Sequence, residues 1–201
     1  MGDFMGWFSS KPKVKKIKLK SGIITKDPFK ENLLYVSKKD ISFDRSAGFF
    51  SPYKCNFKIK IIYEKAINQE PYWGIEVNTY RKLSSANLDK MEKMIEEEPM
   101  WREMDDFIVM ASGKRLVSDS LRFESNKKAT DKTREAWSGG LVKFSQENFI
   151  SIVEDNNLSM RYYGLCNNSQ FDLEDNEVSK IKQICILAFN DYRSIAELER
   201  D

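Results

Sequence analysis

The densest group of side chains that could do chemistry is the acidic run between Glu92 and Asp106. Carboxylates held together can bind a hard cation such as Mg²⁺ or Mn²⁺, because these ions prefer oxygen ligands. Neighbouring glutamates on a helix point in different directions, however, and no Asp-x-Asp pattern or glycine-rich phosphate loop accompanies the run. We interpret it as a solvated acidic face, with a metal-dependent enzyme as an alternative, and assign neither a metal site nor a cofactor.

Histidine is absent from all 201 residues. Its absence excludes Ser-His and Cys-His nucleophile pairs, imidazole acid/base catalysis and imidazole-ligated zinc or iron. The three cysteines, Cys55, Cys166 and Cys185, are far apart and lack C-x-x-C pairing, which favours neither a disulfide framework nor a zinc cluster. We therefore predict a non-catalytic protein in a reducing, cytoplasmic compartment.

The charge is divided along the chain. Residues 1–65 hold 15 Lys and Arg against 6 Asp and Glu, whereas residues 66–201 hold 18 against 25. The overall charge of +2 conceals this division. Because clustered positive charge attracts anionic surfaces, the basic N-terminal third indicates an acidic partner.

Apolar residues alternate with lysines from Lys15 to Thr25, which predicts one strand with an apolar face and a basic face. The clearest alternation puts Cys55, Phe57, Ile59, Ile61 and Tyr63 on one face of another strand. Cys55 is then a core residue rather than a nucleophile. Further strands are predicted at Leu33–Val36, Ile41–Phe43 and Tyr72–Tyr80.

Beyond residue 80 the pattern changes. A helix is predicted over residues 85–98, ended by Pro99. Residues 101–111 fit either a second helix or a strand, and we favour a helix from Trp101 to Asp106. The polar stretch 124–140 ends in two glycines and predicts a mobile loop or a short exposed helix. Later strands are predicted at Leu141–Phe144, Phe149–Val153 and Leu158–Tyr163, and a long helix begins near Asp175.

These elements predict one α+β domain over residues 1–201. Its sheets are mainly antiparallel and curved, with a helix near 85–98 and a long C-terminal helix packed on the sheet. Residues 1–12 form an N-terminal strap, and residues 124–140 form the mobile loop. No apolar run approaches the length of about 20 residues that a membrane-spanning helix requires.

The candidate binding surface is a basic sheet face beside an aromatic loop. If the first strand and the strand 55–63 share one sheet with their apolar faces inward, their lysines share its outer face. Like charges side by side repel, so an acidic partner would stabilise this arrangement. The alternative is that they are solvated lysines that discourage edge aggregation. The candidate lysines are Lys16, Lys18, Lys20, Lys58 and Lys60.

The aromatic loop carries Phe49, Phe50 and Tyr53 next to glycine and proline. Exposed aromatic residues commonly anchor interfaces, although these rings could equally plug the end of the sheet. Together with the basic face, they predict an inhibitor, immunity or accessory factor that binds an acidic protein.

A second candidate partner is an anionic membrane surface, because apolar residues at the N-terminus precede a cationic stretch. The candidate membrane contacts are Phe4, Trp7, Phe8, Lys11 and Lys13. Nucleic acid is less favoured, since the aromatic residues of strand 55–63 lie on the face opposite its lysines.

Overall fold

The computed structural model describes residues 14–27, 32–46, 54–84, 106–116, 124–129, 133–163 and 170–192. These residues form two antiparallel sheets and two helices, which confirms the predicted α+β fold class. The expected strap at 1–12 and the expected helix at 85–98 lie outside the described residues.

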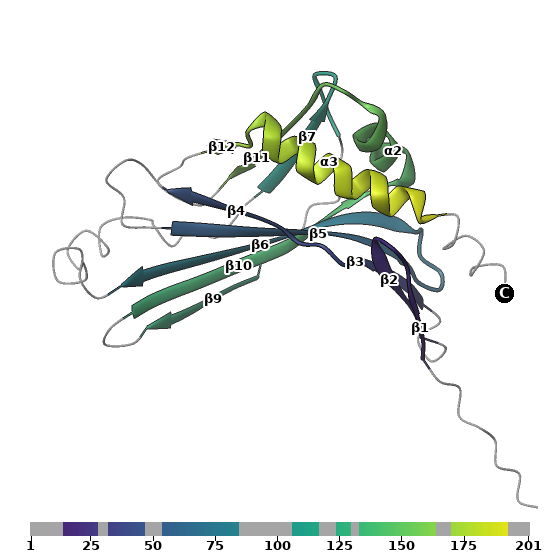
Figure 1. Cartoon of the computed structure of the whole chain (residues 1–201), viewed down its shortest axis with the longest axis horizontal. Coiled ribbons are helices and arrows are strands. Elements are labelled where there is room, and N and C mark those ends of the chain that lie inside the picture. The colour runs from purple at the N-terminus through teal and green to yellow at the C-terminus, as the bar shows by residue number, and fades with distance from the viewer. Residues whose placement is uncertain are drawn as a thin grey trace, which may run out of the picture.

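The larger sheet has the strand order β1-β2-β3-β5-β6-β10-β9, and β4 pairs with the part of β5 that β3 leaves unpaired. Its pairs are antiparallel, and the sheet is strongly twisted and curved (Figure 1). The strands are β1 (Lys15–Lys18), β2 (Gly22–Asp27), β3 (Asn32–Ser37), β4 (Ile41–Ser46), β5 (Lys54–Lys65), β6 (Tyr72–Ser84), β9 (Glu124–Ala129) and β10 (Thr133–Phe144).

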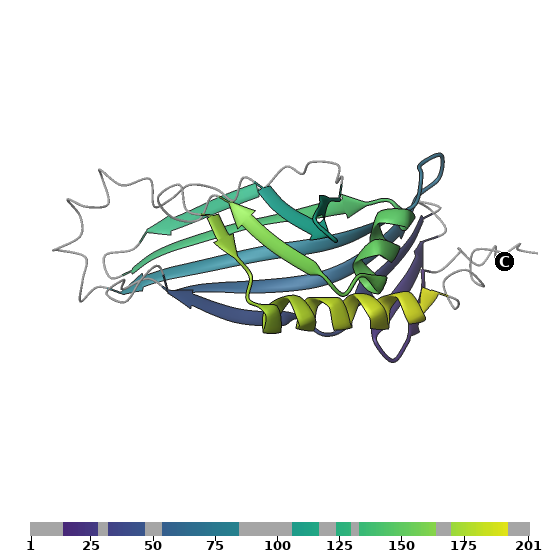
Figure 2. The same ribbon diagram turned by 90° about the horizontal axis from the view of Figure 1, so that it is seen from above.

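The smaller sheet has the order β12-β11-β7-β8. Its strands are β7 (Asp106–Ala111), β8 (Lys114–Arg115), β11 (Leu158–Tyr163) and β12 (Gln170–Asp172), and the helices are α2 (Gln146–Glu154) and α3 (Asp175–Asn190). The helices and the smaller sheet all lie on one side of the larger sheet (Figures 1 and 2). We call the face that they cover the covered face.

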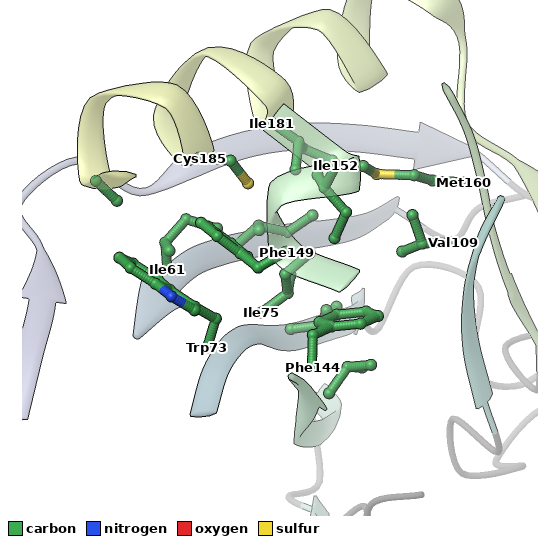
Figure 3. Packing of buried hydrophobic residues seen from close by; sticks show 14 of the residues in the cluster. Ile61, Trp73, Ile75, Val109, Phe144, Phe149, Ile152, Met160, Ile181 and Cys185 are labelled. Carbon is green, nitrogen blue, oxygen red and sulfur yellow. The ribbon is translucent and has the colours of Figure 1, made fainter. Parts of the chain in front are cut away.

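Alternating residues of the long strands fill the core between these layers. Trp73 has no exposed surface, and its ring stacks on Phe149 with centroids 4.2 Å apart and planes 5° apart (Figure 3). An aromatic pair of this kind contributes about 0.5–1.5 kcal/mol beyond its buried area. The buried hydrophobic residues of β5 and β6 are Ile59, Ile61, Tyr63, Trp73, Ile75 and Val77. Those of β5 confirm the predicted inward face at these three positions.

The C-terminal helix α3 packs on the sheet through an apolar stripe at three- and four-residue spacing. Its N-cap is Glu174, one residue before the predicted Asp175, and the Glu174 N–H donates to the Glu177 carboxylate at 2.8 Å. Burial raises the pKa of the Cys185 thiol, which therefore stays neutral and serves as a core residue. The buried stripe consists of Val178, Ile181, Cys185 and Ala188.

The C-terminal end of α3 is joined to the turn between β1 and β2. The hydroxyl of Ser21 donates to the carboxylate of Asp191, and it lies 3.0 Å from the hydroxyl of Tyr35. Burial raises the pKa of Tyr35 to about 12, so that its hydroxyl remains neutral and can donate to Ser21. These contacts fix the edge hairpin against the helix.

The strand predicted at Phe149–Val153 is wrong, because these residues belong to helix α2. The β-branched run favours a strand, but Ser145 precedes it and caps a helix by accepting a hydrogen bond from the Asn148 N–H at 3.2 Å. Phe149 and Ile152 then share one buried face of the helix.

The mobile loop predicted at 124–140 is also wrong. Residues 124–129 and 133–140 are strands, and β10 pairs with β6 from Thr133 to Phe144. The polar composition of these residues favoured a loop. They form strands because pairing with a neighbouring strand of the sheet decides strand formation more than local propensity does.

Two other boundaries differ from the predictions. Residues 15–25 form a hairpin rather than one strand, and the Leu19 N–H donates to the Gly22 carbonyl at 2.9 Å across the turn. Asp106, the last residue of the second predicted helix, is the first residue of strand β7. The rest of that predicted helix, residues 101–105, lies outside the described residues.

Candidate functional site

The strand register brings four of the five predicted lysines to one face of the larger sheet. Lys18 pairs with Ile23, Ile23 with Val36, and Val36 with Ile62. Paired residues share a face, and successive residues alternate between faces. Ile61 is buried on the covered face, so its neighbour Ile62 lies on the opposite face. Lys18, Ile23 and Val36, which are paired in one row with Ile62, lie on that opposite face as well. We call it the open face; its lysines with described side chains are Lys16, Lys18, Lys58 and Lys60, with Lys143 on β10.

Lys20 does not belong to this group. It lies in the turn between β1 and β2, whereas the prediction extended one strand through it. The turn also changes the place of Ile23, which unbroken alternation over residues 15–25 would put on the apolar face with Ile17. In the structure Ile17 pairs with Ile24 on the covered side, and Ile23 lies on the open face.

The lysines of the open face differ in their surroundings. Lys16, Lys18 and Lys58 are exposed, and within the described part of the chain no ion pair involves them. The Lys60 Nζ lies 3.7 Å from an Asp40 carboxylate oxygen, and Lys60 pairs across the strands with Glu76. Among the described residues, positive charge without an ion pair therefore lies on β1 and at the middle of β5.

A polar cluster lies at one end of the open face. The Tyr72 hydroxyl donates to the Glu64 carboxylate, and the Lys143 Nζ lies 4.2 Å from the centre of the Tyr72 ring. Burial, and next the neighbouring Glu64, raise the pKa of Tyr72 well above its usual value. The hydroxyl therefore stays neutral, and Glu64 and Lys143 are both held close to the sheet.

Between the lysines the open face is apolar, a feature that the predictions missed. Each of its apolar residues is partly exposed and directly precedes or follows a buried residue of the covered face. Apolar doublets that break the strand alternation are therefore the signal that could have located them. They are Ile23, Leu34, Val36, Ile62 and Leu141, beside the buried Ile24, Leu33, Tyr35, Ile61 and Val142.

Gly74 allows this apolar surface to reach β10. A Cβ at Gly74 would lie 2.4 Å from Leu141 Cδ1, so the leucine side chain occupies the space above the glycine. Gly74 also pairs with Ile62 on one side and with Lys143 on the other. The apolar strip is therefore continuous from β2 to β10.

The remaining candidate residues lie outside the described residues. They are Phe49, Phe50 and Tyr53 of the aromatic loop, Phe4, Trp7, Phe8, Lys11 and Lys13 of the N-terminus, and residues 92–105 of the acidic run. In the part of the chain that is described, no group of three or more potential ligands among Cys, Asp and Glu could hold a metal ion. No described helix is both long and apolar enough to cross a bilayer.

The open face thus combines partly exposed apolar side chains with exposed lysines. Comparisons with protein-family models, with curated proteins and with solved structures found no match for this chain.

Proposed function

We propose that this protein is a non-catalytic interaction protein, such as an inhibitor, immunity or accessory factor, whose open face binds an acidic partner. One observation carries the proposal: Lys16, Lys18 and Lys58 share an uncovered sheet face and have no ion pair within the described part of the chain. Like charges arranged in this way gain stability when an anionic surface covers them. Charge complementarity also speeds the encounter with such a surface.

Competing explanations predict different responses to charge and salt. Lysines that only guard a strand edge would be replaceable without loss of any partner. A binding surface would lose its partner on charge reversal, and it would weaken as salt rises and the Debye length falls from about 10 Å at 0.1 M to about 3 Å at 1 M.

The test is affinity capture from a lysate of the source organism at low and high salt. The test variant is the double substitution Lys18→Glu and Lys58→Glu on the open face. The matched control is Lys114→Glu and Lys180→Glu, two exposed lysines on the smaller sheet and on α3 with the same change in charge. We expect one protein captured by the wild type and the control and lost with the test variant. Equal capture by both double variants would contradict the proposal.

An anionic membrane surface is the alternative partner, and its candidate contacts lie before residue 14. Flotation with vesicles containing anionic lipid separates the two cases. Binding that disappears on deletion of residues 1–10 would favour the membrane, whereas binding to a soluble acidic protein that survives this deletion would favour the open face.

A further inference from the structure

One row of residues crosses the open face from lysine to lysine. Following the pairs from β1 through β2, β3, β5 and β6 to β10 gives Lys18, Ile23, Val36, Ile62, Gly74 and Lys143. Six adjacent strands spaced about 4.8 Å apart make this row roughly 24 Å long. Its centre is apolar and both of its ends are basic.

The rows on either side make the strip wider and add charge at its border. Leu34, two residues before Val36 on β3, and Leu141, two residues before Lys143 on β10, lie next to the row. Lys16 and Lys60 occupy the flanking positions on β1 and β5. An apolar centre with a charged border is the usual composition of a protein-protein interface.

The covered face shows what kind of element fits this sheet. Helix α3 covers it with an apolar stripe that includes Ile181 and Cys185 (Figure 3). The helix has 16 residues, and at 1.5 Å per residue its length is about 24 Å. Within the described part of the chain, no helix or strand covers the open face (Figure 1).

Charge decides the nature of the occupant. The described charged side chains of this face include five lysines and three carboxylates; they are Lys16, Lys18, Lys58, Lys60 and Lys143, and Asp27, Glu64 and Glu76. Glu64 already accepts a hydrogen bond from Tyr72. A second copy of this chain would place lysines against lysines and is disfavoured.

We infer that the open face binds one amphipathic helix of a partner protein, with an apolar stripe over Ile23, Val36 and Ile62 and acidic residues beside it. This inference rests on the proposed function and adds the form of the partner. The helix buries the partly exposed apolar side chains, and its carboxylates pair with Lys16, Lys18 and Lys58 on the same face.

The inference is tested with two displayed libraries of 16-residue helices. Both carry varied apolar residues at positions i, i+3, i+4 and i+7; one carries Glu and Asp on the remaining face, and the other carries Lys and Arg. Selected helices are then measured for affinity against the full chain, against Ile62→Thr on the open face, and against Ile67→Thr as the matched control. The double variant Lys18→Glu and Lys58→Glu is measured in the same way. Ile67 is 55% exposed in the turn between β5 and β6.

We expect the acidic library to yield binders. Ile62→Thr should weaken their affinity about tenfold or more, a loss equal to about 1.4 kcal/mol, and Ile67→Thr should leave it unchanged. Circular dichroism of Ile62→Thr confirms that it is folded. Failure of the acidic library, or acidic binders insensitive to Ile62→Thr, overturns the inference. If acidic binders depend on Lys18 and Lys58 but not on Ile62, the proposed function stands without the helix. If the acidic binders depend on none of Lys18, Lys58 and Ile62, both the proposed function and the helix inference fail.

Discussion

The two faces of the larger sheet are built from the same strands but differ in how far their side chains are buried. On the covered face, Ile61 and Trp73 are fully buried beneath helices and the smaller sheet. On the open face, Ile62 and Val36 remain partly exposed among lysines. Neighbouring residues of one strand supply both faces, but within the described part of the chain only the covered face has a layer of helices and strands packed on it. Under the proposed function, the layer that covers the open face is another molecule.

The largest test of this comparison replaces two neighbouring isoleucines. Ile61→Ala should lower the free energy of unfolding by about 2–5 kcal/mol, because it leaves a cavity in the core. Ile62→Ala should lower it by less than about 1 kcal/mol, because the side chain is already partly exposed and no cavity forms. Urea unfolding of both variants measures the difference. Equal losses would show that the open face is packed as tightly as the core.

Alanine substitutions at Gly22 and Gly74 compare the two faces in another way, because each adds a Cβ to one face. A Cβ at Gly22 would lie 2.1 Å from the ring of Tyr35, which is buried and cannot turn away, so Gly22→Ala should cost about 1–3 kcal/mol. A Cβ at Gly74 would lie 2.4 Å from Cδ1 and 3.3 Å from Cγ of Leu141, a partly exposed side chain that can move on the open face, so Gly74→Ala should cost less. Thermal unfolding checks the order, and a larger loss for Gly74→Ala would contradict it.

The hydrogen bonds at the edge of the covered face should have a smaller effect. Tyr35→Phe removes the hydroxyl that contacts Ser21 and should cost about 0.5–1.5 kcal/mol at neutral pH. The pKa of Tyr35 is raised from 10 to about 12, and therefore the stability that comes from its neutral form is present below pH 10 and is lost between pH 10 and 12. The wild type should lose stability relative to Tyr35→Phe across that window. A constant difference in urea unfolding from pH 9 to 12 would contradict this.

The smallest effect is expected on the smaller sheet, at a surface pair that belongs to neither face. Arg161 donates two hydrogen bonds to Asp172, and they hold the pKa of the Asp172 carboxyl below its usual value. Asp172→Asn should cost less than about 1 kcal/mol, because the pair is exposed to solvent. The contribution is present above the usual pKa of about 3.9 and is lost as pH falls through the lowered value. A loss at pH 7 that exceeds the effect of Tyr35→Phe would contradict the assignment.

Much of the fold could be predicted from local pattern. Strict alternation located β5 and β6, and the helical stripe located α3, because each of these elements has one side against the core. Pattern failed where contacts distant in sequence decide the structure. Strand β10 pairs with β6 and β9 pairs with β10, so sheet pairing rather than composition forms β9 and the polar part of β10. Helix α2 is capped by Ser145, although the composition of the segment favours a strand.

The candidate site was predicted in part. Alternation was enough to bring Lys16, Lys18, Lys58 and Lys60 to one face, because strand pairing preserves the side on which each residue lies. It placed Lys20 wrongly, since a turn interrupts the strand. It also missed Ile23, because the strand register and not the sequence spacing determines which member of the Ile23-Ile24 doublet is buried.

The isoleucine doublets also provide the most direct test that the open face binds and the covered face does not. We would record methyl spectra of the isoleucine-labelled chain while adding the acidic helix of highest affinity selected from the libraries. We expect the methyl resonances of Ile23 and Ile62 to shift in proportion to occupancy, while those of the adjacent Ile24 and Ile61 stay in place. Bound helix with shifts at Ile24 and Ile61, or with none at Ile23 and Ile62, would contradict the assignment of the open face as the binding surface.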